Sequence, residues 1–254
     1  SVDYTFLADQ RPAQKQLLDY LSQKQLLLIL DNFEHLLEGA GLINALLGAA
    51  PQVKILVTSR ARLKLSGETV LSITGMDAPE PGEMAGTTTW QDIANYSAVQ
   101  LFLQSARRAQ PDFALTNDNW QAVTQICHLV GGMPLGILLT TTWLELLSPP
   151  EIVTEISRSL DLLETEHLDV PERQRSVRAV FDHSWQMLTE PEQRVFLQLS
   201  TFRGGFSREA AEAVTGASLG ILMSLINKSL LTRGSSDRYE IHELLRQYGL
   251  EKLA

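Results

Sequence analysis

The run Leu26–Leu30, followed directly by Asp31, restricts the fold more than any other stretch of the chain. Five consecutive apolar residues between polar neighbours are typical of a strand that is buried on both faces of a parallel sheet. A carboxylate that follows such a strand opens into the crevice where α/β sheets bind ligands. The stretch therefore predicts an α/β fold with Asp31 at a ligand-binding edge.

Asp31 itself has two interpretations. In a strand of the Walker B type, the sheet fixes a carboxylate that holds hydrated Mg²⁺ beside nucleotide phosphates. Alternatively, Asp31 and Glu34 stand just before an apolar-periodic helix and could cap it. This stretch alone leaves both interpretations open.

The neighbouring segments extend the α/β pattern. Apolar spacing predicts one helix before the strand, at 14–21, and one after it, from about 35 to 50. The segment Lys54–Arg60 predicts a second buried strand that ends in two hydroxyls and an arginine, and Val70–Ile73 predicts a third, shorter strand. Strands that alternate with helices favour a parallel sheet.

Residues 75–94 are rich in glycine, proline and threonine, which is typical of a linker between domains. Beyond them the pattern is helical almost to the end. We therefore expect part of a sheet domain at 1–90, a helical domain at 91–170 and a third domain at 171–254. Helices are predicted at 98–110, 117–130, 134–147, 149–163, 174–188, 190–202, 207–215 and 218–228.

The third domain closes differently from the rest. Ser229–Thr232 and Arg238–Ile241 predict two short strands around a turn, and a final helix follows from His242 to Leu253. Short helices followed by a hairpin resemble a winged-helix unit. The expected fold class is α/β followed by mostly α, with a partial parallel sheet, a helical domain and a winged-helix domain.

Charge and apolar content exclude several classes of protein. A net charge of −9 argues against a general nucleic-acid surface, which needs a dense basic patch. No apolar run approaches the ~20 residues of a membrane span. The single cysteine, Cys127, lies in an apolar helical segment, where a packed thiol is expected in a reducing compartment. We expect a cytoplasmic protein without a membrane partner.

Five short stretches stand in an order and at spacings that occur together in one protein family. They are Leu26–His35, Leu56–Arg60, Gly132–Leu135, Phe202–Phe206 and Tyr239–Leu245. With these motifs the chain resembles the STAND signal-transduction ATPases, relatives of the NB-ARC switch proteins. It is most similar in kind to bacterial regulators that join an ATPase core to DNA-binding or repeat modules. The resemblance covers nearly the whole chain.

The resemblance implies a role for each matched residue. Asp31 is the Walker B carboxylate that binds Mg²⁺ through water, and Arg60 is the sensor arginine that approaches the terminal phosphate. Pro134 packs against the adenine base, and His242 contacts the β-phosphate of ADP and locks a closed state. Each residue also has a plainer reading: a helix cap for Asp31, an ion pair or surface site for Arg60, a helix start for Pro134, and a capping or packed side chain for His242.

Three departures from the family pattern affect these roles. No Gly-x-x-x-x-Gly-Lys-Ser/Thr loop occurs in the chain, so we expect residue 1 to fall inside the nucleotide domain, downstream of that P-loop. Asn32 replaces the second acid that many relatives use to activate water, and an amide cannot accept that proton. Glu34 is the substitute catalytic candidate. Finally, Glu243 follows His242 where the family often has aspartate.

The expected function is a nucleotide-dependent signalling switch that controls oligomerisation or transcription, with slow or no hydrolysis. The intact protein would use ATP or ADP with Mg²⁺, whereas this chain alone, without the P-loop, would bind little nucleotide. Expected partners are an upstream P-loop segment, a downstream sensor or repeat domain, and further copies of the chain. The alternative is a DNA-binding or protein-interaction scaffold with a vestigial nucleotide site. Direct nucleic-acid binding by this region is not expected, because its helices near the end are poor in basic residues.

A related expectation concerns the sheet. In this ATPase class the P-loop strand lies between the strand ending at Arg60 and the Val70 strand. Without it, strand edges are exposed and can pair with another chain.

Overall fold

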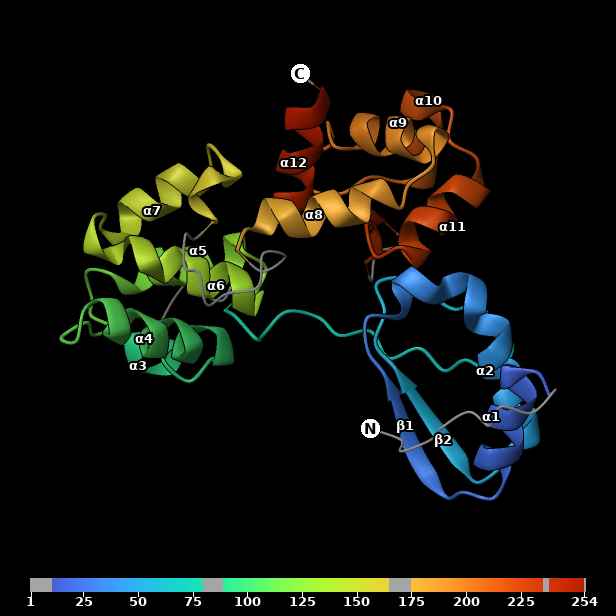
Figure 1. Cartoon of the computed structure of the whole chain (residues 1–254). Helices are drawn as coiled ribbons and strands as arrows, with labels where there is room; N and C mark the ends of the chain where they lie inside the picture. The colour runs from blue at the N-terminus through green and yellow to red at the C-terminus, as the bar shows by residue number, and fades with distance from the viewer. Residues whose placement is uncertain (1–10, 80–88, 165–174, 235–237, 254) are drawn as a thin grey trace. The chain divides into compact units, whose positions relative to one another are not determined.

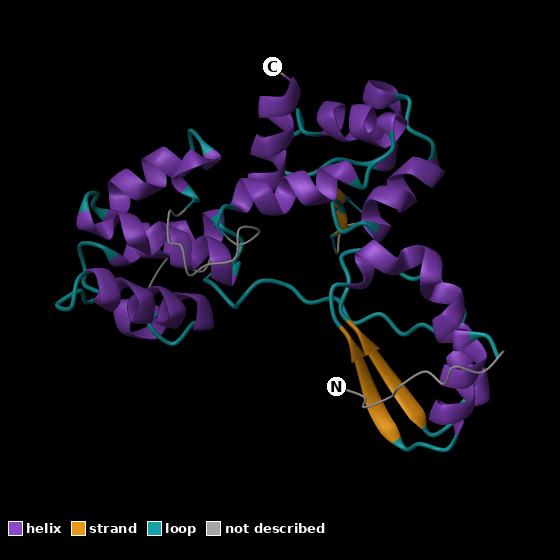
Figure 2. Cartoon of the chain, viewed as in Figure 1, coloured by secondary structure: helices purple, strands orange, loops and turns teal. Residues whose placement is uncertain are grey.

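The structure is a computed structural model that describes residues 11–79, 89–164, 175–234 and 238–253 (Figure 1). Helices make up most of these residues, and the strands are few and short (Figure 2). Backbone contacts divide the chain into two compact units. Unit 1 comprises Ser1–Leu71 with Asn227–Ser229, and unit 2 comprises Ser72–Ile226 with Leu230–Ala254.

Unit 1 confirms the predicted parallel α/β pattern. Its two strands pair in parallel along their full length, from Leu26 beside Val53 to Leu30 beside Val57. The predicted second helix begins as a 3-10 helix and becomes α-helical only after Gly39, because the backbone at Leu36 is not helical. In chain order the elements are α1 Ala13–Ser22, β1 Leu26–Leu30, η1 Phe33–Gly39, α2 Ala40–Ala49 and β2 Val53–Val57.

The prediction that β1 is buried on both faces is wrong. Leu26 and Leu28 pack with the helices α1 and α2, which cover one face of the strand pair. On the other face, Leu27 is 58% exposed, Ile29 60% and Leu56 53%. The reason is that both helices lie on the same side of a sheet of only two strands, so alternate side chains have no layer to pack against.

The third strand predicted at Val70–Ile73 is also not formed. Leu71 is 85% exposed and Ile73 89%, and no described strand lies beside this segment. A segment needs a neighbouring strand to satisfy its backbone groups before it becomes part of a sheet. The apolar composition of Val70–Ile73 was therefore not sufficient to predict a strand.

Unit 2 contains almost all the remaining elements, which agrees with the predicted helical pattern. One short helix was missed, at 90–93 inside the predicted linker, where Thr89 and Asp92 cap each other's backbone. The elements are α3 Trp90–Ile93, α4 Ser97–Ala109, α5 Trp120–Leu129, α6 Pro134–Thr141, η2 Thr142–Glu145, α7 Pro149–Ile156, η3 Leu160–Leu162, α8 Val177–Gln186, α9 Glu190–Leu199, α10 Arg208–Thr215, α11 Leu219–Asn227, β3 Thr232–Arg233, β4 Tyr239–Glu240 and α12 Glu243–Leu253.

The helix predicted from Pro134 to Leu147 changes its winding at Thr142. Three consecutive threonines, Thr140–Thr142, each donate a side-chain hydrogen bond of 2.8 Å to the carbonyl three residues earlier. Such bonds compete with the regular helical ladder. The α-helix accordingly ends at Thr141, and the 3-10 helix η2 follows it.

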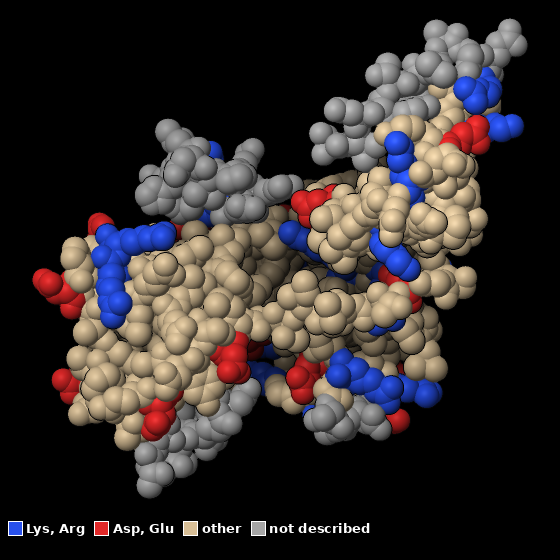
Figure 3. Space-filling view, turned by 90° about the horizontal axis from the view of Figure 1, so that it is seen from below, with Lys and Arg blue, Asp and Glu red and all other residues tan. Residues whose placement is uncertain are grey.

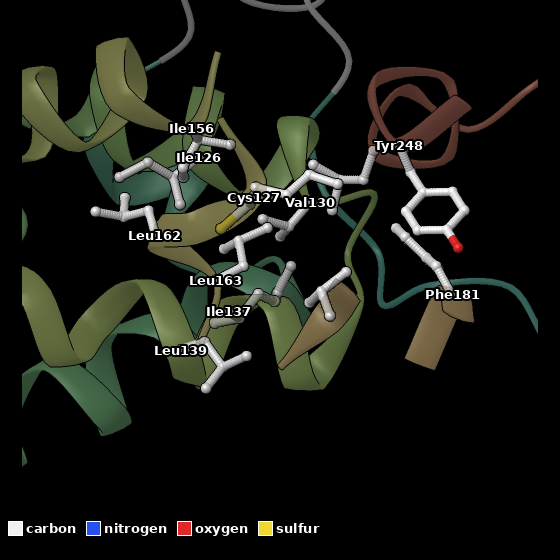
Figure 4. Packing of buried hydrophobic residues seen from close by; sticks show 14 of the residues in the cluster. Ile126, Cys127, Val130, Ile137, Leu139, Ile156, Leu162, Leu163, Phe181 and Tyr248 are labelled. Carbon is white, nitrogen blue, oxygen red and sulfur yellow. The ribbon is translucent and has the colours of Figure 1, made fainter. Parts of the chain in front are cut away.

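One continuous apolar core runs through unit 2. Figure 4 shows its central part, where Cys127, Leu163 and Ile137 lie near one another and the rings of Phe181 and Tyr248 meet. These two rings join α8 to α12 with centroids 5.7 Å apart. Cys127 is fully buried, and burial raises the pKa of its thiol to about 12. The prediction of a packed thiol is confirmed, and the raised pKa disfavours the reactive thiolate form.

The chain end forms the predicted hairpin, with β3 and β4 antiparallel and Thr232 beside Glu240. The helix α12 follows at once. The order of helices, hairpin and helix agrees with the sequence pattern, while the winged-helix assignment stays a prediction.

Charged side chains are mixed over the visible surface. On the face drawn in Figure 3, lysines and arginines stand in small groups between acidic and uncharged side chains. No single helix among the described residues has the length and hydropathy to cross a membrane. Helices α10 and α11 pass that test only when they are taken together across a 109° bend.

Candidate functional site

The carboxyl ends of β1 and β2 are joined by one residue, Thr58. Its hydroxyl donates to Oδ1 of Asp31 and accepts a 2.9 Å hydrogen bond from the backbone N–H of Asn32. Its backbone N–H donates to the carbonyl of Leu30 at 3.0 Å, and its carbonyl accepts from the N–H of Phe33 at 2.9 Å. Thr58 therefore fixes the turn that carries Asp31.

Asp31 lies where a hydrated metal ion could be held. The side chain is exposed, and in the described part of the chain Oδ2 has no hydrogen-bond or ion-pair partner. The helix cap that the sequence left open for Asp31 is not formed, because Asn32 is the N-cap residue of η1 and no side chain bonds to the first turn. Mg²⁺ commonly binds through one or two carboxylates, several waters and substrate phosphates. One fixed and otherwise open carboxylate oxygen fits that requirement.

Arg60 and Glu34 form an ion pair at the same end of the sheet. The Arg60 Nε lies 3.6 Å from Oε1 of Glu34, and the arginine side chain is 35% exposed. Neither oxygen of Glu34 accepts a hydrogen bond from the described residues. The ion-pair alternative for Arg60 is thus observed, and Glu34 faces a cation rather than standing as an unpaired base.

The loop before Pro134 depends on two glycines in unit 2. Gly131 and Gly132 have φ of +59° and +62°, a region that residues with a Cβ rarely adopt. Their N–H groups donate to the carbonyls of His128 and Cys127 at 2.9 Å and so complete the end of α5. Pro134 then occupies the first turn of α6, as the sequence predicted.

His242 lies against this loop, although it is more than a hundred residues further along the chain. A Cβ added to Gly131 would stand 1.8 Å from the His242 Nε2, so the ring packs directly on the glycine. The N–H of Leu244 donates to Nδ1 of His242 at 3.2 Å. Nδ1 is therefore an acceptor, and the neutral ring carries its proton on Nε2.

The surroundings of His242 favour this neutral form. Burial lowers the pKa of His242; His128 lowers it further, whereas Glu243 acts in the opposite direction. A neutral ring with its proton on Nε2 can still donate one hydrogen bond to an oxygen ligand.

A third segment meets the same loop. The N–H of Met76 donates to the carbonyl of Gly132 at 2.8 Å. A Cβ on Gly75 would stand 1.8 Å from the Gly131 carbonyl oxygen. The loop Gly131–Pro134 is thus the meeting point of the segment after unit 1, the end of α5 and the residue before α12.

The predicted site residues accordingly form two sets. Asp31, Glu34 and Arg60 lie in unit 1, whereas in unit 2 Pro134 ends the Gly131–Pro134 loop and His242 packs on Gly131 of that loop. Sequence reasoning noted the two hydroxyls before Arg60 but did not assign Thr58 to the site.

Comparison with known proteins gives one clear likeness. No family model matches the chain. Over 96% of its length it is 35% identical to the Mycobacterium tuberculosis protein named "Putative HTH-type transcriptional regulator Rv0890c". The chain resembles a mycobacterial regulator. It spans 27% of that relative's length.

Two further comparisons are weaker. The chain is 30% identical to "Uncharacterized protein Rv0894" of the same organism, matching 94% of this chain and 60% of that protein. Among solved structures, the Pyrococcus horikoshii STAND protein PH0952, which has a tetratricopeptide repeat sensor, matches 94% of this chain and 30% of its own. That match has a TM-score of 0.31 and 18% identity, which is too low to support an argument about fold or function.

Proposed function

We propose that this chain is the switch region of a nucleotide-dependent regulator of the STAND type. The carrying observation is the contact between His242 and the Gly131–Pro134 loop. It brings together two motifs, far apart in sequence, that the family resemblance assigns to the same bound ADP. In the proposed closed state, Pro134 packs against the adenine. The Nε2–H group of His242 donates a hydrogen bond to a phosphate oxygen.

Unit 1 carries the residues proposed for the metal ion and the terminal phosphate. Asp31 holds hydrated Mg²⁺, and Arg60 leaves Glu34 to bind the terminal phosphate of ATP. A guanidinium forms strong charge-assisted hydrogen bonds with phosphate oxygens, so it can exchange one anionic partner for another. ATP and ADP bias the switch because only ATP offers that third phosphate.

Hydrolysis is proposed to be slow. The position after Asp31 holds Asn32, whose amide cannot accept a proton from water. Glu34 remains the substitute candidate, and in the proposal it is paired with Arg60 only until Arg60 turns to the phosphate. The switch would then be reset mainly by nucleotide exchange.

The first test measures ADP release from the full-length protein. His242→Ala should speed ADP dissociation by roughly 10-fold or more, since one hydrogen bond to a charged group contributes about 1.5–3 kcal/mol. His242→Gln keeps an N–H donor near the same place and should retain part of the effect. The control is an exposed side chain on α5, changed as Gln121→Ala. Unchanged ADP release in His242→Ala would overturn the assignment of the lock.

The output of the switch is proposed to be transcriptional. Relatives that are named as HTH-type regulators are much longer than this chain, which leaves room for DNA-binding and sensor or repeat modules outside it. Self-association would accompany the open state.

Direct DNA contact by this region is not part of the proposal. Helix α11, which precedes the hairpin, carries no lysine or arginine between Leu219 and Asn227. A salt-dependent mobility shift of duplex DNA by this chain would favour the DNA-binding scaffold instead.

A further inference from the structure

We infer that Thr58 is a positioning residue for Asp31, holding one carboxylate oxygen so that the other is presented to a magnesium–nucleotide complex. This inference rests on the proposed function, because it needs a nucleotide bound with Mg²⁺ at Asp31. It adds a residue to which the proposed mechanism gives no role.

The base of the Thr58 side chain is fixed by the backbone. Its N–H donates to the carbonyl of Leu30 at the end of β1, at 3.0 Å, and its carbonyl accepts from the N–H of Phe33 after the turn, at 2.9 Å. Thr58 is therefore held on the same turn that carries Asp31. Branching at Cβ limits the side chain to few rotamers, which favours one hydroxyl position.

The hydroxyl has only one way to make its hydrogen bonds. The N–H of Asn32 can only donate, so Thr58 Oγ1 must accept there. The single hydroxyl proton is left for Oδ1 of Asp31, which as a carboxylate oxygen can only accept. The bond thus has a defined direction and fixes the orientation of the carboxylate.

Asn32 is part of the same arrangement. Its φ of +60° lies in the left-handed region, where asparagine is one of the better tolerated residues. This conformation aims the Asn32 N–H at the Thr58 hydroxyl, at 2.9 Å. The backbone and the hydroxyl of Thr58 thus form hydrogen bonds with the residues on both sides of Asp31 and with Asp31 itself.

The neighbouring hydroxyl does not share this role. Ser59 Oγ accepts from the N–H of Ala61 at 3.1 Å, within its own turn. Ser59→Ala is therefore a matched control, because it removes a hydroxyl one residue away without touching Asp31.

The test compares ATP affinity of the full-length protein in Mg²⁺ and in EDTA, with a fluorescent ATP analogue as the probe. Thr58→Val should lose about 10-fold or more of the Mg²⁺-dependent gain in affinity and change the affinity in EDTA less than about 2-fold. Thr58→Ser should restore the gain, and Ser59→Ala should behave as the unchanged protein.

A double-mutant cycle with Asp31→Asn separates positioning from a structural role. If Thr58 acts through Asp31, Thr58→Val has no further effect on Mg²⁺ dependence in the Asp31→Asn background. Equal Mg²⁺ dependence in Thr58→Val and the unchanged protein overturns this inference alone. Loss of affinity in EDTA and Mg²⁺ alike, with a normal Thr58→Ser protein, also overturns it and indicates a structural role. An unchanged protein that binds no ATP at all overturns the proposed function as well.

Discussion

At the scale of single residues, Gly131 is the position where an added methyl group would push the loop after α5 away from His242. Gly131→Ala places a Cβ 1.8 Å from the His242 ring and forces alanine to a φ of +59°. We expect a loss of about 1–2 kcal/mol from the left-handed backbone and about 1–3 kcal/mol more from the clash. All four tryptophans lie in unit 2, so denaturant unfolding followed by tryptophan fluorescence measures this loss directly.

Gly216 is the matched control for this prediction. It has a φ of +66°, but an added Cβ there would meet nothing within 4 Å. Gly216→Ala therefore carries the backbone penalty without the clash. If both substitutions lower the free energy of unfolding equally, His242 does not pack on Gly131.

Single residues also show what local sequence could not reveal at the site. Asp31 was found because it follows a strand with a clear apolar pattern, whereas Arg60 and Pro134 were assigned to the site through the family resemblance. The role of Thr58 depends on which strand lies beside β1. A local sequence pattern does not show that pairing.

At the scale of elements, α12 is held in place by side chains from α8 and η3. The Tyr248 hydroxyl donates to Asp182 at 2.6 Å, and Lys252 lies 3.1 Å from the same carboxylate oxygen. Arg178 bridges Asp161 in η3 at 2.7 Å and Glu251 in α12 at 2.5 Å. These contacts join the beginning and the end of the third predicted domain to the helical domain.

The two kinds of contact should differ in strength. Tyr248 is 1% exposed, so Tyr248→Phe should lower the free energy of unfolding by about 1–2 kcal/mol. Arg178→Gln should cost less than about 1 kcal/mol, because its ion pairs are partly exposed to solvent. Tryptophan fluorescence serves here too, since Trp185 lies 6.2 Å from the Tyr248 ring. A larger loss for Arg178→Gln would contradict this ranking.

The uncovered face of the β1–β2 pair gives a second prediction at this scale. Exposed Leu27, Ile29 and Leu56 form an apolar surface on a strand pair whose outer edges have no partner strand among the described residues. Such a surface favours association between copies. Ile29→Thr keeps a branched β-carbon while removing apolar area, so it should reduce the associated fraction in size-exclusion chromatography with light scattering. Leu28→Thr, on the covered face, should instead destabilise unit 1. A chain that stays monomeric at every concentration would count against this interpretation of the sheet.

At the scale of the whole molecule, the predicted site residues fall in two compact units. Asp31 and Arg60 belong to unit 1, and Pro134 and His242 belong to unit 2. A nucleotide can bias either unit only if its contacts with that unit differ between ATP and ADP. The terminal phosphate, which Arg60 would bind in exchange for Glu34, is such a difference.

The sequence by itself determined the order and type of most elements, including the parallel pair β1–β2, the helices of unit 2 and the closing hairpin. Those features depend on local apolar spacing, prolines and glycines, which can be recognised in the sequence without knowledge of the fold. Only the tertiary structure decided that β1 has one uncovered face and that Val70–Ile73 forms no strand, because burial and strand pairing require a neighbour. The same holds for the Thr58–Asp31 bond and the contact of His242 with Gly131, since each joins residues whose proximity is set by packing between elements.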